Sequence, residues 1–234
     1  MNKVLIVIPA YNEEANIEHV VRELEEKYPQ FDYIVVNDGS RDRTAAICRE
    51  QGFSLLDLPV NLGLAGCFQA GMKYAYYKGY EYAIQFDGDG QHRPEFIEPM
   101  RKKMEEGYEI VIGSRFVNAK KDWSMRMVGS RLIEAAIRLT TGVTVNDPTS
   151  GMRMFNREMI REFALNLNYG PEPDTVSYLL KQGAKIAEVP VHIAERAGGE
   201  RELYKADGGC AVYGEDAAVD SSDPEFPEQF SHAP

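Results

Sequence analysis

The stretch that decides the fold lies near the start of the chain and reads KVLIVIPAYNEE, residues 3–14. Its first half is a continuous apolar run that ends at Pro9, which is typical of a strand buried on both faces. Asn12 then predicts the N-cap of a helix, and Glu13 and Glu14 are favourable in a first helical turn. A buried strand that leads directly into a helix indicates an α/β protein.

The alternation of strand and helix continues outward from this stretch. Apolar periodicity predicts further strands at residues 33–36, 53–58 and 82–86, and helices at 17–28, 44–51 and 64–78. Gly52 and Gly79 are expected to end two of these helices. Four strands joined by three helices predict a parallel sheet with right-handed crossovers, in which ligands bind beyond the carboxyl ends of the strands.

The second half of the chain is less regular. Helices are expected at 94–106, 124–141, 157–164 and 174–182, and strands at 109–112, 153–155 and 185–193. Pro99 marks a break or a restart in the first of these helices. Residues 202–234 carry eight acidic side chains and one lysine without sustained periodicity. We expect an acidic tail there that is disordered or poorly packed, with a short packed helix as the alternative.

Composition points to one large domain followed by this tail. Of the 234 residues, 44% are hydrophobic and 27% are charged, which is ordinary for a chain that buries a core. The net charge of −11 disfavours a nucleic-acid-binding protein. We expect neither a signal peptide nor a membrane-spanning helix. Three scattered cysteines without a CxxC motif favour reduced thiols and a cytoplasmic location.

Two carboxylates, Asp87 and Asp89, stand two residues apart at the end of a predicted strand. Hard divalent cations such as Mg²⁺ and Mn²⁺ take oxygen ligands of this kind and can bridge them to a diphosphate. Gly88 allows close approach of the backbone, and Gln91 and His92 follow at once and can complete or orient the site. A solvated acidic turn is the alternative interpretation.

Polar residues also follow the first two predicted strands. Asp38 can accept a hydrogen bond from the base or the ribose of a nucleotide, or it can form an Asp turn with its own backbone. Tyr11 can stack on a base and Glu13 can accept a hydrogen bond from it, although both residues would also suit plain helix capping. Asp38 and the two later carboxylates are expected at the same edge of the sheet. Together they indicate a binding site more strongly than either feature does alone.

Seven motifs in order resemble the family 2 glycosyltransferases, which have the GT-A fold. They lie at residues 7–14, 36–42, 61–63, 87–92, 113–116, 147–153 and 188–191. The resemblance covers residues 3 to about 200. It is closest to polyprenyl- and dolichyl-phosphate sugar synthases and bacterial polysaccharide glycosyltransferases. It implies an α/β, Rossmann-like GT-A domain at 1–201, with a mixed, mainly parallel sheet flanked by helices. The nucleotide-binding half would span about 1–115 and the acceptor half about 116–201.

On the donor side, the resemblance implies a set of residues that bind the nucleotide sugar. This set comprises Pro9, Tyr11, Glu13, Asp38, Asp87, Gly88, Arg115 and Arg196. Asp87 would lie near the ribose and the metal, and Asp89 would bind Mg²⁺ or Mn²⁺ together with Gln91. Arg196 belongs to a segment that resembles the family's flexible loop over the donor. After Glu200 the sequence departs from the family pattern, which would continue into an amphipathic or membrane-spanning region.

On the acceptor side, Arg115 would face the sugar diphosphate or an acceptor phosphate, for which a planar guanidinium is well suited. A surface ion pair is the alternative. The resemblance places Asp147 and Ser150 near the transferred sugar or its acceptor. Glu172 or Asp174 would be the general base. We favour Asp174, for which a helix N-cap is the alternative role, and an ionised lipid phosphate acceptor would need no base.

The function that these features predict is metal-dependent, inverting transfer of a sugar from a nucleotide-diphosphate sugar. The acceptor would be a polyprenyl phosphate or a glycan, as in polysaccharide biosynthesis. The expected location is the cytoplasm, with peripheral association at the inner face of the membrane left open. A nucleotide-sugar-binding domain without turnover remains an alternative. A nucleotidyltransferase is a second one, although it would carry a basic, glycine-rich loop after the first strand instead of an acidic one.

Overall fold

The structure is a computed structural model, and it describes residues 3–88, 90, 92–117, 125–166, 170 and 172–192, without the side chains of 125–128. The strands within these ranges form one sheet. They are β1 (Val4–Ala10), β2 (Asp32–Asn37), β3 (Leu55–Asp57), β4 (Tyr82–Gln85), β5 (Ile110–Ser114), β6 (Arg153–Asn156) and β7 (Ile186–Pro190). The strand order is β3-β2-β1-β4-β6-β5-β7.

The helices of the same ranges alternate with these strands. They are α1 (Ile17–Lys27), α2 (Thr44–Gln51), α3 (Gly63–Lys78), the short 3₁₀ helix η1 (Pro94–Phe96), α4 (Ile97–Glu105), α5 (Met125–Thr141), α6 (Arg157–Leu165) and α7 (Pro173–Lys181). Gly52 and Gly79 follow α2 and α3 in the left-handed conformation, which confirms the predicted helix ends. Asn156 caps α6, because its side chain accepts a hydrogen bond from the backbone N–H of Met159 over 2.9 Å.

One strand of the sheet runs against the others. β1 is parallel to β2 and β4, β2 is parallel to β3, and β5 is parallel to β7, whereas β6 is antiparallel to both β4 and β5. The expectation of a mixed, mainly parallel sheet is therefore confirmed. Because β6 runs backwards, its first residue, Arg153, lies opposite Gln85, the last residue of β4. The loop that precedes β6 thus joins the carboxyl ends of the parallel strands.

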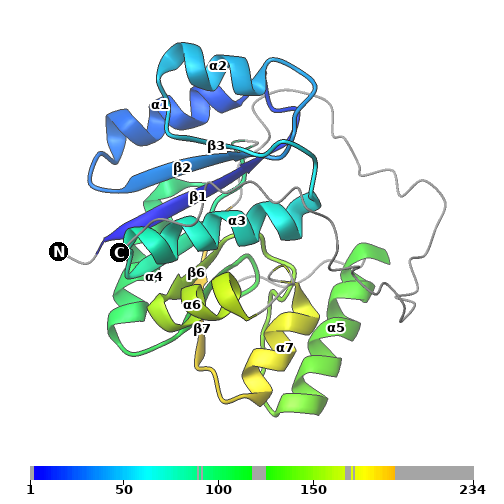
Figure 1. Ribbon diagram of the computed structural model, residues 1–234. Coiled ribbons are helices and arrows are strands. Elements are labelled where there is room, and N and C mark those ends of the chain that lie inside the picture. The colour runs from blue at the N-terminus through cyan, green and yellow to red at the C-terminus, as the bar shows by residue number, and fades with distance from the viewer. Residues whose placement is uncertain are drawn as a thin grey trace, which may run out of the picture. The chain divides into compact units, whose positions relative to one another are not determined.

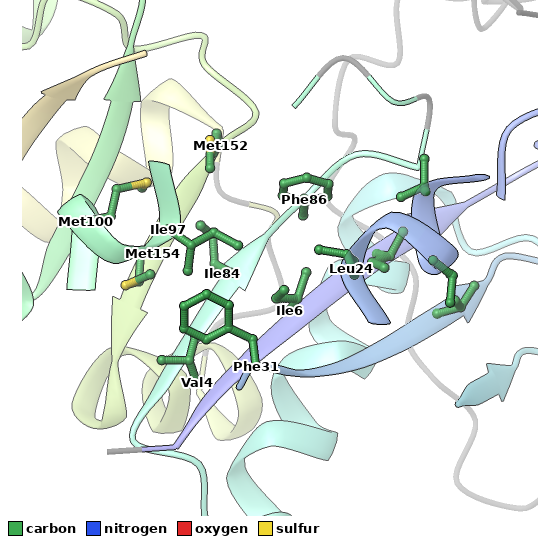
Figure 2. Packing of buried hydrophobic residues seen from close by; sticks show 14 of the residues in the cluster. Val4, Ile6, Leu24, Phe31, Ile84, Phe86, Ile97, Met100, Met152 and Met154 are labelled. Carbon is green, nitrogen blue, oxygen red and sulfur yellow. The ribbon is translucent and has the colours of Figure 1, made fainter. Parts of the chain in front are cut away.

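The sheet is the middle of three layers (Figure 1): α1, α2 and α4 cover one face, and α3, α5, α6 and α7 cover the other. Successive residues of β1 alternate between these two cores, as a strand buried on both faces must. Figure 2 shows the first core, in which Ile6 and Ile84 of the sheet pack with Leu24 of α1 and with Ile97 and Met100 of α4. Each such buried side chain contributes about 1.5–3 kcal/mol.

Pro9 does not end the first strand as the sequence predicted, because β1 continues to Ala10 and pairs Pro9 with Val36. The hydrogen bonds explain why the ring is tolerated. The Ala10 carbonyl accepts from the Asp38 N–H on the β2 side, and the Val7 carbonyl accepts on the β4 side. The backbone groups of residue 9 therefore face the β4 side of the strand, but β4 has already ended at this level. A backbone N–H at position 9 would have no partner in the sheet, so proline costs no hydrogen bond there.

The prediction that Asn12 caps the first helix is wrong. The helix begins at Ile17, and Asn12 has φ +55, a left-handed conformation that asparagine tolerates better than most residues. Its side chain accepts from the Arg41 N–H over 2.9 Å, and its own N–H donates to the Ser40 hydroxyl over 3.0 Å. Asn12 therefore ties the loop after β1 to the loop after β2.

Pro99 does not break the predicted helix over 94–106. It lies in the first turn of α4, where a backbone N–H has no partner within the helix, so proline costs little there. The interruption falls earlier, between η1 and α4. Among the described residues, no helix has both the length and the apolar character needed to cross a bilayer.

Candidate active site

The candidate site is the edge of the sheet at which the parallel strands end. Asp38 directly follows β2, Asp87 lies two residues after β4, and Arg115 directly follows β5. The antiparallel β6 brings a fourth segment to this edge, the turn at residues 147–151. Residues that lie up to 113 positions apart in sequence are therefore gathered at one edge by the topology alone.

Asp38 is a buried carboxylate that is only half satisfied. It is 2% exposed, and its Oδ1 accepts from the backbone N–H of Leu62 over 2.7 Å. Its Oδ2 is buried without a hydrogen-bond partner. Burial raises the pKa of Asp38, while the N–H groups of Leu62 and Gly63 oppose that rise. The contact with Leu62 rules out the simple Asp turn, and the unpaired oxygen is a ready acceptor for a ligand N–H or O–H.

Asp87 is held by His92 from two sides. The Asp87 N–H donates to His92 Nδ1 over 2.9 Å, so the proton of the neutral ring is on Nε2. That Nε2 lies 3.4 Å from Asp87 Oδ2. The imidazole is buried and packs edge-on against Phe86. His92 thereby orients the Asp87 side chain, which remains 39% exposed and open to a ligand.

Gly151 completes this arrangement from the turn before β6. A Cβ atom at this position would lie 2.8 Å from Asp87 Oδ2 and 3.3 Å from His92 Cε1. Only glycine fits without displacing the aspartate or the imidazole. The turn that belongs to the acceptor half therefore lies directly against the donor-side carboxylate.

Arg115 and Asp147 form a buried bidentate ion pair. Arg115 Nε and Nη2 donate to the two carboxylate oxygens over 2.6 and 2.7 Å, and the Arg115 N–H adds a third bond of 3.0 Å. Asp147 is fully buried, and this pairing raises the pKa of Arg115. The predicted alternative of a weak surface pair does not describe this contact. Nη1 makes no hydrogen bond to the described residues. That Arg115 binds a phosphate stays a prediction.

Glu188 of β7 holds the backbone of the segment that carries Asp147. Its Oε1 accepts from the Asp147 N–H over 2.9 Å, and its Oε2 accepts from the backbone and side chain of Asn146. Ser150 is also used inside the turn, since its hydroxyl donates to the Gly113 carbonyl over 2.5 Å. The turn at 147–151 is therefore anchored to both β5 and β7. Contacts of Asp147 and Ser150 with the transferred sugar or its acceptor stay a prediction.

The residues after β1 line the neighbouring part of the edge. The Glu13 side chain accepts from Asn16 over 2.8 Å, and its N–H donates to Thr44 over 2.9 Å. Gly88 is buried, and a Cβ atom there would lie 3.2 Å from the Pro9 carbonyl. Pro9 and Tyr11 are half-buried. Their contacts with a nucleotide base stay a prediction.

The two candidate bases lie at the start of α7. Glu172 occupies the N-cap position without a side-chain cap bond, and Asp174 follows in the first turn. The predicted alternative of Asp174 as the N-cap is therefore wrong, and both side chains are exposed. Three further predicted site residues, Asp89, Gln91 and Arg196, lie outside the described residues.

The sequence reasoning missed Arg153 and Glu188 as site residues, although both lie within quoted motifs. The signal that could have found them is a charged residue inside a short predicted strand, because such a residue must be paired or functional. The described residues contain no group of three His, Cys, Asp or Glu side chains that could hold a metal ion. Asp87 by itself supplies the exposed oxygen ligand that a hard divalent cation prefers.

Comparison with solved structures defines the fold class. The fold is that of GT-A glycosyltransferases: the structure superimposes on glucosyl-3-phosphoglycerate synthase from Mycobacterium tuberculosis with a TM-score of 0.64 and 22% identity, over 85% of this chain and 73% of that chain. That structure was solved in complex with Mn²⁺, UDP-glucose and phosphoglyceric acid.

Residues 5–163 match the family model for glycosyl transferase family 2, and the chain belongs to this family. It is similar to polyprenol monophosphomannose synthase of Mycolicibacterium smegmatis, with 29% identity over 207 residues, covering 83% of this chain and 78% of the relative. It is also similar to undecaprenyl-phosphate mannosyltransferase of Micrococcus luteus, with 28% identity over 213 residues, covering 86% and 87%. The predicted family, fold and enzyme class are confirmed.

Proposed function

We propose that this glycosyltransferase moves a sugar from a nucleotide-diphosphate sugar to a polyprenyl phosphate, with inversion at the anomeric carbon. The observation that carries the proposal is the carboxyl edge. Asp38 has a buried oxygen without a partner, His92 orients Asp87, and Arg115 has an Nη1 that makes no hydrogen bond to the described residues. The names of the relatives in M. smegmatis and M. luteus support a lipid phosphate as the acceptor.

Asp38 would bind the base of the donor. Its unpaired Oδ2 needs a donor group, and the N–H of a nucleobase supplies one at a depth that water does not reach. Pro9, Tyr11 and Glu13 would form the rest of the base pocket. The nucleotide would thus lie over the carboxyl ends of β1 and β2.

Asp87 would bind the diphosphate end of the donor through Mg²⁺ or Mn²⁺, with Asp89 and Gln91 as further ligands. The donor set fits, because all three side chains offer oxygen atoms and His92 already orients Asp87. When bound, the cation neutralises the charge of the nucleotide diphosphate that leaves. Solved relatives of the same fold contain Mn²⁺ or Mg²⁺ together with UDP.

Arg115 would bind the acceptor phosphate. Asp147 fixes the plane of the guanidinium, so the position of Nη1 is set before the ligand binds. A phosphate monoester is already ionised and can attack the anomeric carbon without a base. If the acceptor is a glycan hydroxyl instead, Asp174 would remove its proton, and Arg115 would then contact the sugar diphosphate.

Calorimetry with UDP-, GDP- and dTDP-sugars in the presence of Mn²⁺ tests the donor half of this proposal. Asp89→Ala is expected to abolish the metal-dependent part of nucleotide binding, and Asp38→Ala is expected to weaken free nucleosides as well. Transfer of labelled sugar to undecaprenyl phosphate, with the Asp89→Ala variant as the blank, tests the acceptor half. Tight donor binding without transfer to a lipid phosphate or a glycan would instead favour a nucleotide-sugar-binding protein.

A further inference from the structure

Two loops at the carboxyl edge of the sheet are tied together by hydrogen bonds that run in both directions. Three successive backbone N–H groups of the loop after β1 donate to side chains of the loop after β2. The pairs are Asn12 with the Ser40 hydroxyl, Glu13 with the Thr44 hydroxyl and Glu14 with the Asp42 carboxylate, over 3.0, 2.9 and 3.0 Å. The partners are 28 to 31 residues apart in sequence, so these contacts belong to the tertiary structure.

The loop after β2 also donates back to the loop after β1. The Arg41 N–H donates to Asn12 Oδ1 over 2.9 Å, and the Arg43 N–H donates to Glu14 Oε2 over 2.9 Å. Asn12 and Glu14 therefore each give one hydrogen bond to the other loop and accept one from it. Reciprocal bonds of this kind fix the position of both loops, because a shift of either loop breaks several bonds at once.

Thr44, the first residue of α2, is the buried member of this network. Its residue is 0% exposed, and its hydroxyl accepts from the Glu13 N–H while it donates to Asp42 Oδ1 over 2.5 Å. The hydroxyl is thus used both as a donor and as an acceptor. Valine has the same shape but can form neither bond, so it would leave the Glu13 N–H without its acceptor.

The backbone at Asn12 indicates what the network achieves. In the part of the chain that the structure describes, Asn12 is the one residue other than glycine with a positive φ, +55. Such a conformation persists where the surrounding contacts determine it, and it is commonest at binding and catalytic sites. Asn12 stands between Tyr11 and Glu13, so its backbone conformation sets the direction of both neighbouring side chains.

The facing side of the same edge is fixed as well. The Asp38 N–H donates to the Ala10 carbonyl over 2.9 Å, and the Asp38 carboxylate accepts from the Leu62 N–H. Gly39 follows directly, and a Cβ atom there would lie 2.7 Å from the backbone nitrogen of Asn61. The separation between Asp38 and the loop after β1 is therefore set by the protein itself.

We propose that Asn12, Ser40 and Thr44 are positioning residues for the nucleoside part of the donor. Their hydrogen bonds hold the loop after β1 at a fixed distance from Asp38, so the base pocket is formed before the donor binds. The inference rests on the proposed function, which assigns residues of both loops to the base. A pocket that is formed in advance binds more tightly, because no part of the binding free energy is used to order the loop.

Calorimetry tests this assignment without any need for turnover. The probes are uridine and guanosine, and UDP and GDP with Mn²⁺. Thr44→Val and Ser40→Ala should each weaken the binding of nucleoside and diphosphate by the same factor, about tenfold, because only the loop after β1 is released. Thr44→Ser keeps the hydroxyl and should bind within about twofold of the wild type. Asn12→Gly keeps the left-handed backbone accessible, so it should lose less affinity than Asn12→Ala.

Kinetics of transfer to undecaprenyl phosphate add a second measurement. In Thr44→Val the donor KM should rise by about tenfold with an unchanged kcat, since the base is held equally in the ground state and the transition state. Thr141→Val is the matched control. Thr141 is the last residue of α5, and its hydroxyl donates to the Ile137 carbonyl over 2.7 Å and accepts from the Val143 N–H over 3.2 Å. This variant loses the same two kinds of hydrogen bond and should bind the donor like the wild type.

Unchanged nucleoside affinity in a folded Thr44→Val or Ser40→Ala variant would overturn the proposal, and so would a loss confined to the Mn²⁺-dependent part of nucleotide binding. Ser40 is half-buried, so Ser40→Ala decides the matter even if Thr44→Val does not fold. Nucleoside binding that depends on these hydroxyls, without any sugar transfer, would support the positioning role and contradict the proposed function. Sugar transfer by the wild type, with unchanged nucleoside affinity in both variants, would do the reverse.

Discussion

At the scale of single residues, the Arg115–Asp147 pair is the contact whose loss should be most damaging. Asp147→Ala leaves the Arg115 guanidinium without its fully buried partner, so the free energy of unfolding should fall by about 3–5 kcal/mol. Urea denaturation measures this. Glu50→Ala is the control, because Glu50 pairs with Arg43 on the surface and exposed pairs stabilise weakly. Equal, small losses in both variants would contradict the burial of the pair.

Loss of the His92 imidazole should lower the metal-dependent affinity for a nucleotide and leave the affinity for a free nucleoside unchanged. His92→Phe keeps an aromatic ring against Phe86 but removes both contacts with Asp87. We expect Mn²⁺-dependent binding of UDP or GDP to weaken by about tenfold or more, since residues behind a metal ligand commonly have effects of this size. The affinity for the free nucleoside should not change. Calorimetry with nucleoside and nucleotide separates the two, and equal losses in both would show that His92 only stabilises the fold.

Because of Asp38, the free energy of unfolding should fall as the pH rises through the acidic range. Its pKa is raised in the folded protein, so the native state holds the proton more firmly than the unfolded chain does. The stabilisation is present at low pH and is lost as pH rises from the ordinary aspartate value to the raised one. Asp38→Asn should therefore melt higher than the wild type at pH 7, and the gap should narrow toward about pH 4. A gap that does not change with pH would contradict this.

At the scale of elements, the turn before β6 is the part of the site with least room for change. Gly151→Ala places a methyl group against Asp87 and His92, so it should lower the melting temperature and weaken Mn²⁺-dependent nucleotide binding. Gly129→Ala is the matched control, since Gly129 lies within α5 with open space at its Cβ position. There alanine should stabilise the helix by about 0.5–1 kcal/mol. Similar behaviour of the two variants would argue against close contact at Gly151.

At the scale of the whole molecule, the sequence of residues 202–234 leads to a prediction about the tail, which lies outside the described residues. Its eight acidic groups repel one another, and each ordered residue costs about 1–2 kcal/mol of backbone entropy. Removing 202–234 should therefore change the melting temperature by less than about 2 °C. Strong protection of this segment in limited proteolysis, or a large fall in melting temperature, would show that it packs on the domain.

The sequence by itself determined the layered fold and the edge at which the site lies. Strand-length apolar runs and helices at a spacing of three to four residues depend on neighbours along the chain, so α2 and the helix stop at Gly52 appear as predicted. The motifs likewise placed Asp38 and Asp87 at the ends of strands. The family model confirms the resemblance that these motifs indicated.

Tertiary structure alone decided which of these residues meet. The reversed direction of β6 brings Gly151 against Asp87 and turns Asp147 onto Arg115, and no local pattern encodes a strand's direction. The same pairing left Arg153 buried with unpaired nitrogens. The physical reason is that hydrogen bonds and ion pairs act over a few ångströms, so their partners are set only when the sheet has brought distant segments together.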